Sequence, residues 1–513
     1  MGAMDEMSDI QRYFADKSVL VTGATGFLGK VLVERILRTC DVKTLYLTVR
    51  PKKNKGAQQR VKEYFDNPVF EKLRDEKDDF LRKVKVVVAD FQLPNLGMGQ
   101  HDREMLKEEI DVVLLTAATT RFDESLKIAV HTNLRSTKDM LKLCMESKHL
   151  LSVVYVSTAY ANCIEPELQE KFYKPPVQNT ELLTMVDALN DETLDVCGSA
   201  ILKSWPNNYV FTKLVAEECI KTMGNKLPIS IVRPSIITST LRDPVPGWND
   251  SYLGATGIFV GVSLGVIRTH HCNFDKVSDI VPVDYVANCI LAAAAQNRVQ
   301  TNDVQSSYRK ISNCDDIPIY NCVTSNRNPT TWRDCFKYGI HYAGQFPVSS
   351  QLWHVVFLPT SSKHLFLVLN FLLHTVPAYI VDFFAVLFGK KPEFVKGSQK
   401  IGKLLNVLSY FSIRDWSFHD TNTRKLWNGL NKTDQSLYLF DVDMIDWNSY
   451  FKDFAIGGRK YLIKENINTI PEAKAKRLKL AIVHYSLIVF LSLILFQVVS
   501  WTCSSIYNTV LKT

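Results

Sequence analysis

A tyrosine and a lysine four residues apart could together transfer a proton to a carbonyl group. Tyr209 and Lys213 stand in the segment YVFTK, and side chains at this spacing share one face of a helix. A phenol with a pKa of about 10 is a weak acid at neutral pH, but an adjacent ammonium group stabilises the phenolate and lowers that pKa. Ser157 and Thr158 lie upstream, directly after an apolar run, where a hydroxyl could hold the carbonyl oxygen beside the tyrosine.

A glycine-rich loop near the N-terminus indicates a dinucleotide site. The segment TGATGFLG follows an apolar run and precedes a helical run at 30–37. In such a loop one glycine permits the tight turn, one lets the backbone approach a pyrophosphate, and one lets helix and strand pack closely. The helix N-terminus then offers N–H groups and a partial positive charge to the anion. The residues expected to bind the cofactor here are Thr22, Gly23, Thr25, Gly26, Phe27, Leu28 and Gly29.

The ends of the next predicted strands favour NADPH over NADH. Arg50 follows the second apolar run, with Lys52 and Lys53 close behind, and the acid that would grip a free 2′-hydroxyl is missing. Asp90 ends the third run, where its carboxylate could accept from the adenine amino group. Ala117 and Ala118 follow the fourth run and are small enough to let the cofactor lie close. No Cys/His cluster has the spacing of a metal site.

The order of apolar and helical segments predicts the fold class. Six short apolar runs alternate with segments of helical length, as in a Rossmann-type doubly wound parallel α/β sheet. They are residues 18–21, 44–49, 84–88, 111–115, 152–156 and 229–232. With 513 residues, 46% hydrophobic and 22% charged, the chain is neither disordered nor a multi-spanning membrane protein. A net charge of +8 is mild, and no nucleic-acid partner is expected.

The C-terminal part of the chain is much more apolar. Residues 480–502 carry no formal charge and, as a helix of about 34 Å, could cross a bilayer core of about 30 Å. Basic residues precede this segment, which by the positive-inside rule leaves the bulk of the chain in the cytosol. Residues 351–389 are also apolar but are interrupted by Asn370, His374, Pro377 and Asp382. A second span, a cap over an apolar ligand tunnel, a segment resting in the membrane interface and an ordinary helical core all stay open for them.

Several motifs together resemble one family. TGATGFLG, VSTAY (156–160), YVFTK and IVRPSII (231–237) are similar to extended short-chain dehydrogenase/reductases. AATTRFDESL (117–126), PVPGW (244–248), DIVPVDYVAN (279–288) and YNCVTSNRNPTTW (320–332) narrow the resemblance to the alcohol-forming fatty acyl-CoA reductases. Residues 351–454 resemble the sterile-type C-terminal domain of that family, and the terminal apolar helix resembles its anchor. Thr116 departs from the family pattern, which often has a histidine there.

The resemblance implies roles for the candidate residues. Tyr209 would be the proton donor, Lys213 its electrostatic partner and a ribose ligand, and Thr158 or Ser157 the group that holds the carbonyl, with Thr158 favoured. Pro234 and Ser235 would lie beside the nicotinamide. The implied reaction is reduction of a long-chain fatty acyl-CoA by NADPH, through a bound aldehyde, to a primary alcohol for ether lipids or wax esters.

The same resemblance implies a division of the chain and a membrane. The expected parts are an N-terminal tail (1–15), a reductase domain (16–340), a sterile-type domain (341–473), a transmembrane anchor (478–503) and a short tail (504–513). The peroxisomal membrane is favoured, with the endoplasmic reticulum as the alternative. A membrane-bound hydroxysteroid dehydrogenase and a non-catalytic, tail-anchored lipid-binding protein are the rival functions, and the oligomeric state is open.

Overall fold

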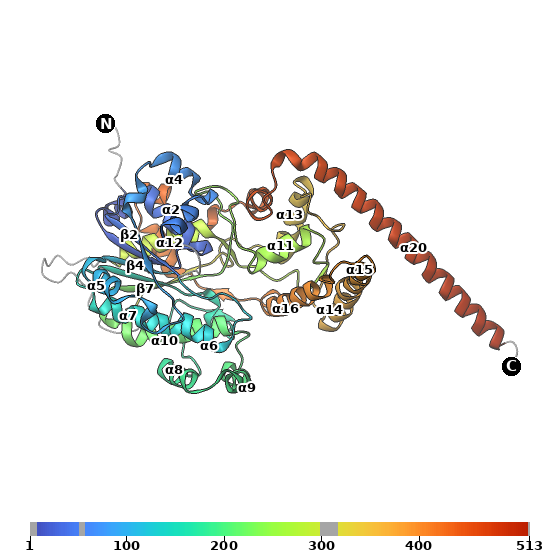
Figure 1. Ribbon diagram of the computed structural model, residues 1–513, viewed down its shortest axis with the longest axis horizontal. Coiled ribbons are helices and arrows are strands. Elements are labelled where there is room, and N and C mark those ends of the chain that lie inside the picture. Colours follow the sequence, from blue (N-terminus) through green and yellow to red (C-terminus); the bar gives the residue numbers. More distant parts are fainter. Residues whose placement is uncertain (1–7, 51–56, 298–315, 511–513) are drawn as a thin grey trace.

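The computed structural model describes residues 8–50, 57–297 and 316–510 (Figure 1). Lys52 and Lys53, which we expect near the cofactor's 2′-phosphate, lie outside these residues. A sheet with helices on both faces forms one end of the molecule. Shorter helices form the other end, and one long helix extends away from the body.

A seven-stranded parallel sheet confirms the predicted fold class. Its strand order is β11-β7-β5-β4-β1-β2-β3, and the order of connection switches between β1 and β4. In such sheets the carboxyl ends of the strands at this switch point are where ligands bind. The sequence did not predict β11, a four-residue strand that follows a long polar stretch. The strands are β1 (Ser18–Thr22), β2 (Thr44–Val49), β3 (Val84–Val88), β4 (Val112–Leu115), β5 (Ser152–Val156), β7 (Ile229–Pro234) and β11 (Ile319–Cys322).

Each face of the sheet buries its own apolar core. Val19 and Val21 of β1 join the core under α2 (Phe27–Thr39) and α12 (Val283–Gln296), whereas Leu20 joins the opposite core. This alternation follows from the two-residue period of a strand. The second core lies under α5 (Gln100–Glu109), α7 (Ser136–Glu146) and α10 (Asn208–Met223). Both faces of the strands are therefore covered, except at the edge strand β3, which is only partly buried and carries Lys85. This burial explains the unbroken apolar runs of the other strands.

The smaller, mostly helical C-terminal part packs back onto the reductase sheet. The strand β13 (Ser417–Phe418) pairs with β6 (Glu167–Leu168), and α17 (Thr421–Asn428) lies on β11. The helix α19 (Trp447–Gly457) packs on α13 (Trp332–Gln345). Residues 9–14, which we expected in an N-terminal tail, instead form α1 (Asp9–Phe14), because Ile10 and Phe14 are buried.

Short elements complete the body. The helices are α3 (Ala57–Phe65), α4 (Glu71–Glu76), α6 (Leu126–Ala129), α8 (Asn179–Ala188), α9 (Asp191–Leu202), α11 (Ala255–Ser263) and α18 (Lys432–Leu437). The strands are β8 (Ile236–Thr238), β9 (Thr269–His271), β10 (Ile280–Pro282) and β12 (Leu358–Thr360).

The apolar region after residue 351 forms a helical hairpin. The helices α14 (Lys363–Asn370) and α15 (Val376–Leu387) continue through a π-helical segment (Phe371–Thr375) as one 25-residue helix. This helix forms the first arm of the hairpin, and α16 (Phe394–Ser412) returns beside it as the second arm. Most of the large apolar side chains of α14 and α15 are exposed. The region is therefore not an ordinary helical core, and these side chains do not close around an internal tunnel.

The long terminal helix α20 (Ile470–Val510) contains the expected anchor segment. Its first turns rest on the body, where the Lys476 ammonium donates to the Ser349 carbonyl at 2.6 Å and Ala473 is buried. Beyond Tyr485 its apolar part extends clear of the body, with nearly every large side chain exposed (Figure 1).

Candidate active site

The three glycines of the N-terminal loop serve different purposes. Gly23 has a φ of +66°, and a Cβ there would lie 2.8 Å from the backbone of Ala117. A Cβ at Gly29 would lie 2.2 Å from the Gly23 carbonyl oxygen, so α2 and the loop could not pack as they do. Gly26 is exposed and has an ordinary φ of −77°, and its Cβ would meet only the Gly23 oxygen, at 3.1 Å. Close packing of the backbone therefore requires glycine at positions 23 and 29. Gly26, in contrast, borders open space beside α2.

The N-terminus of α2 is available to an anion. Its N-cap residue is Gly26, no side chain caps it, and its first turn holds no acid. Thr25 is exposed beside it, while Leu28 is half-buried and Phe27 stacks on Trp248 with centroids 5.4 Å apart. Since the side chain of Phe27 is engaged with the protein, the backbone N–H groups of the first turn are what this helix offers to a phosphate.

Hydrogen bonds hold the loop against the end of β4. The Thr22 hydroxyl accepts from the Ala117 N–H at 3.2 Å, and the Thr116 hydroxyl donates to the Thr22 carbonyl at 2.5 Å. Ala118 follows half-buried in the same loop. Thr116 therefore links β1 to β4, in the position where the family pattern often has a histidine.

Arg50 and Asp90 meet each other at the ends of β2 and β3. The Arg50 Nε lies 3.5 Å from Asp90 Oδ1, and the guanidinium is 55% exposed. The Asp90 carboxylate also accepts from the Gln92 N–H at 3.1 Å. The structure thus brings together the two side chains assigned to the adenosine end of the cofactor and leaves the arginine open to a ligand.

Thr158 and Tyr209 form the centre of the site. Thr158 follows β5, and Tyr209 stands in the first turn of α10, whose N-cap Asn207 accepts from the Val210 N–H at 3.1 Å. The Thr158 hydroxyl donates to the Pro234 carbonyl at 3.4 Å and accepts from the Tyr160 N–H at 3.3 Å, and it lies close enough to the Tyr209 phenol to act on its pKa in the lowering direction. Burial raises the pKa of Tyr209 to about 12, so the phenol is protonated at neutral pH and can donate to an oxygen.

Lys213 does not play the expected electrostatic part in this structure. Its ammonium donates to the Val156 carbonyl at 2.7 Å and to the Tyr155 hydroxyl at 3.2 Å, instead of facing Tyr209. The pKa of Tyr209 is therefore raised by burial, where we expected the lysine to lower it. Burial also lowers the pKa of Lys213 to about 7, while the nearby Glu217 carboxylate acts in the opposite direction. The lysine can change its protonation state near neutral pH.

Two buried hydroxyls at the site have no hydrogen-bond partner within the described ranges. They are Ser157 Oγ, after β5, and Ser235 Oγ, after β7. Buried polar groups are nearly always satisfied, so orphaned hydroxyls at the carboxyl end of the sheet fit a bound polar molecule. Together with the uncapped helix α2 and the exposed Arg50, they show that the residues present suit a dinucleotide.

Sequence reasoning missed the aromatic wall beside Tyr209. The Phe122 ring lies 5.9 Å from the Tyr209 ring and, on its other side, 5.9 Å from Phe411 of α16. Phe411 also packs edge-on against Tyr160, at 5.2 Å. These contacts join the catalytic loops to the C-terminal part of the chain, and no local pattern in the sequence signals them. Tyr155, the partner of Lys213, was likewise hidden in an apolar strand.

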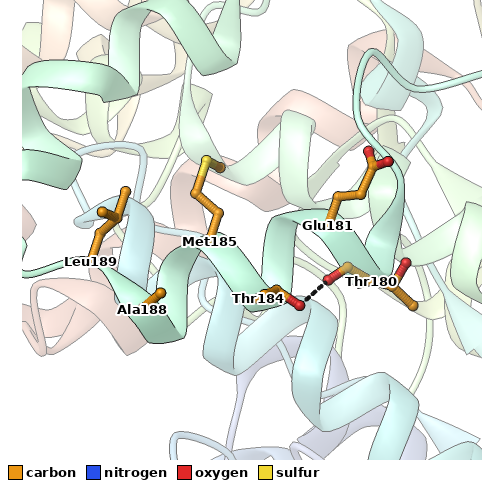
Figure 2. A pocket seen from close by; sticks show the side chains of 6 residues that line it. All are labelled: Thr180, Glu181, Thr184, Met185, Ala188 and Leu189. Atoms are coloured by element: carbon orange, nitrogen blue, oxygen red, sulfur yellow. Dashed lines mark hydrogen bonds between the residues drawn. The ribbon is translucent and has the colours of Figure 1, made fainter.

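A surface hollow elsewhere does not share these residues. It measures about 450 Å³ and lies on α8, where its lining comes from one helix and the residue after it (Figure 2). The Thr184 hydroxyl there donates to the Thr180 carbonyl at 2.9 Å, and Glu181 is the one titratable group of the lining. One carboxylate on one helix provides no catalytic arrangement. Within the described ranges, no group of three or more His, Cys, Asp or Glu side chains could hold a metal ion.

Two family models match this chain in sequence. Both are described as "Male sterility protein"; an NAD-binding model covers residues 21–290, and the Sterile model covers residues 373–465. The first indicates a nicotinamide cofactor. Full-length relatives are also similar: "Fatty acyl-CoA reductase wat" of Drosophila melanogaster is 36% identical, with 93% of this chain and 90% of the relative covered. "Fatty acyl-CoA reductase 1" of Rattus norvegicus is 32% identical, with 96% and 93% covered.

Solved structures support the fold. The terminal reductase domain of the myxalamid pathway superposes with a TM-score of 0.52 at 18% identity, over 87% of this chain and 91% of that one. A reductase domain of a non-ribosomal peptide synthetase from Mycobacterium tuberculosis gives 0.51 at 16% identity, over 88% and 95%. At such identities the likeness concerns the fold alone.

Proposed function

This chain belongs to the fatty acyl-CoA reductases, and we propose that it reduces long-chain fatty acyl-CoA to the primary alcohol and free CoA with NADPH. Family membership rests on relatives that are more than 30% identical over nearly the whole chain. The observation that carries the chemistry is the Thr158–Tyr209 pair, placed at the end of β5 next to a nucleotide-binding loop.

Residues at the carboxyl ends of successive strands suit successive parts of the nucleotide. The first turn of α2, opened by Gly26, would hold the pyrophosphate, and Arg50 would pair with a 2′-phosphate. Ser157 and Ser235 each have a free hydroxyl for the nicotinamide end. Asp90 neutralises part of the Arg50 charge when no ligand is present, so a phosphate would compete with the carboxylate for the guanidinium. The choice of NADPH rests on that arginine.

The two hydroxyls would stabilise the substrate oxygen during reduction. NADPH, when bound, would supply a hydride to the acyl carbon, and a second NADPH would supply another to the aldehyde. Tyr209, protonated because its pKa is about 12, donates a hydrogen bond to the developing oxyanion, and Thr158 donates a second one. In the first reduction the intermediate collapses and CoA leaves as the thiolate. In the second the aldehyde oxygen takes a proton from Tyr209 and the alcohol forms.

Lys213 is suited to restoring the proton that Tyr209 gives up. With a pKa of about 7, it can release or take a proton at neutral pH, and its bonds to Val156 and Tyr155 hold it just behind the catalytic loop. A shift of its ammonium toward Tyr209 when ligands bind would couple the two groups. The aromatic wall of Phe122 and Phe411 would then exclude water from the reacting carbonyl.

The terminal helix supports a membrane location for this chemistry. The 41-residue helix α20 carries an exposed apolar stretch preceded by Lys474, Lys476, Arg477 and Lys479. This arrangement favours one membrane crossing with the reductase body in the cytosol, close to a substrate that partitions into lipid. We propose the peroxisomal membrane and ether-lipid synthesis. Imaging of a reporter fused to residues 470–513 separates the peroxisome from the endoplasmic reticulum.

Product analysis tests the activity. Purified full-length protein is incubated with NADPH and palmitoyl-CoA or stearoyl-CoA, and NADPH oxidation, free CoA and fatty alcohol are measured. The expected result is all three together, whereas steroid substrates should give no turnover. Absence of both CoA release and alcohol with every long-chain thioester would rule the proposal out.

A further inference from the structure

The helical hairpin beside the terminal anchor exposes a continuous apolar surface. From Leu365 to Phe388, large aliphatic and aromatic side chains face outward, and Phe383 is 65% exposed. Soluble proteins rarely expose contiguous apolar patches of this extent unless something covers them. We define the hairpin surface as the outward side chains of α14, the π-helical segment and α15.

The polar residues that interrupt this segment all turn toward the protein. His374 is buried and accepts from the Arg268 backbone N–H at 2.8 Å, while its other ring nitrogen bonds Asn370 at 2.8 Å. Asp382 is buried and accepts from the backbone N–H groups of Phe394 and Val395, both at 2.9 Å, which caps α16. From Leu365 onward the outward face is thereby left without the Asp382 carboxylate and the His374 imidazole, whereas Lys363 and His364 are exposed at the start of α14.

A chain of side-chain contacts connects the π-helical segment to the apolar part of α20. His484, in the apolar part of α20, accepts from Trp353 Nε1 at 3.1 Å. The Arg268 guanidinium lies over the Trp353 ring at 5.5 Å, and it donates to the Leu373 carbonyl at 3.1 Å in the π-helical segment. The middle of the hairpin therefore lies only a few side chains from the part of α20 that enters the bilayer. Both lie on the same side of the body (Figure 1).

Residues 363–387 are long and apolar enough to cross a membrane, but the chain returns to the body through the lysine-bearing helix α16. Before α14, β12 pairs with β9, and after the hairpin α16 packs back on β9 with Leu405 and Phe411 buried. The Ser412 hydroxyl also bonds His270 Nε2 at 3.0 Å. A single crossing would leave the two ends on opposite sides of the bilayer, and a return crossing would place Lys396, Lys400 and Lys403 of α16 in hydrocarbon. The segment therefore lies along one leaflet.

Lysines surround the end of the hairpin where headgroups would lie. Between residues 389 and 403 the chain has five lysines and one acid, Glu393. Lys390, Lys391 and Lys396 are exposed, directly after the last apolar residues of α15. An apolar face bordered by lysines is the pattern of a helix at a lipid–water interface, where the amines contact phosphates.

We propose that the hairpin surface is inserted into the cytosolic leaflet of the membrane that α20 crosses, as a second and non-spanning contact with lipid. The reductase body is then held against the bilayer at two places instead of swinging on one helix. The inference needs the anchor helix in the bilayer but does not depend on the reaction proposed above.

Spin labels on the full-length protein test this contact. Cys197, Cys314 and Cys503 are replaced by serine, and the other cysteines are buried. Phe383→Cys is then labelled with a nitroxide in nanodiscs of phosphatidylcholine and phosphatidylserine that hold one copy of the chain. Collision rates with oxygen, which concentrates in lipid, and with a water-soluble nickel chelate are measured. Leu493→Cys on α20 reports whether the anchor is inserted, and Val196→Cys on α9, 75% exposed, is the aqueous control.

The labels at 383 and 493 should both collide freely with oxygen and be protected from nickel several-fold relative to the label at 196. A label at 383 that collides with nickel as often as the one at 196, while 493 is protected, overturns the proposal and leaves the anchor intact. Protection of 383 from both reagents also overturns it, because protein, not lipid, then covers the hairpin surface. An aqueous label at 493 removes the premise and refutes both contacts.

Discussion

Replacing Gly26 by alanine should separate cofactor binding from folding. The residue has φ −77° and ψ 173°, which any L-amino acid adopts, and an added Cβ would meet only the Gly23 oxygen, at 3.1 Å. A shift of a few tenths of an ångström relieves that contact, so the protein should fold normally. The methyl group, however, would occupy the space in front of the first turn of α2, where the pyrophosphate would bind.

The expected loss follows from the contact that the methyl group displaces. A hydrogen bond between a backbone N–H and a charged phosphate contributes about 1.5–3 kcal/mol, so losing one should weaken NADPH binding roughly 10- to 150-fold. Isothermal titration of Gly26→Ala with NADPH measures this change, and thermal denaturation of the ligand-free protein should show an unchanged Tm.

Gly29→Ala is the matched control, because the same methyl group at that position would lie 2.2 Å from the Gly23 oxygen and 2.8 Å from Ala24 Cα. This variant should lose stability as well as binding. If Gly26→Ala binds NADPH as tightly as the unchanged protein, the pyrophosphate does not lie at this helix. If instead it unfolds as readily as Gly29→Ala, the distinction drawn between the glycines is mistaken.

Three further predictions follow from named side chains. Arg50→Ala should raise the KM for NADPH about tenfold or more and leave the KM for NADH nearly unchanged, since only NADPH has the 2′-phosphate; equal effects on both would remove the assignment. Lys213 has a pKa of about 7 in the folded protein and 10.5 in the unfolded chain. Between pH 7 and 10.5 the unfolded chain therefore binds more protons, so the free energy of unfolding should rise with pH by up to about 1.4 kcal/mol per pH unit. Lys213→Met should abolish that rise in denaturant titrations across this pH window, and an unchanged slope would contradict the assignment. Glu217→Gln removes the carboxylate that lies 2.6 Å from the buried Arg233 guanidinium and should lower the free energy of unfolding by about 3–5 kcal/mol in the same assay. A loss below about 1 kcal/mol would show that water solvates the guanidinium in place of the carboxylate.

The sequence predicts the sheet well because its strands, apart from the partly exposed edge strand β3, are buried on both faces. Each of the six predicted runs coincides with a strand to within a few residues, since an unbroken apolar run is what a two-sided parallel strand requires. The strand β11 escaped prediction because its four residues, Ile319–Cys322, carry a tyrosine and an asparagine and contribute little apolar signal. Likewise, the six residues of α1 are too few to give a clear helical period in the sequence.

The candidate site could be predicted only where it depends on local spacing. The glycine loop and the Tyr209–Lys213 pair have fixed offsets along the chain, so their elements follow from the sequence. The hydrogen-bond partner of Lys213 does not follow from the sequence, because Tyr155 lies on a neighbouring strand and reaches the ammonium only in the folded sheet. The contact of Phe411 with Phe122 joins residues far apart in the chain and depends on how α16 packs.

Product stoichiometry in the unchanged protein and in Tyr209→Phe tests the proposed reaction most directly. Full-length protein in lipid vesicles is given palmitoyl-CoA and NADPH, and hexadecanol, free CoA and oxidised NADPH are counted. The unchanged protein should release one alcohol and one CoA for every two NADPH oxidised, and Tyr209→Phe should bind NADPH but form neither product. An alcohol-forming Tyr209→Phe variant, or an unchanged protein that oxidises NADPH without releasing CoA, would contradict the account.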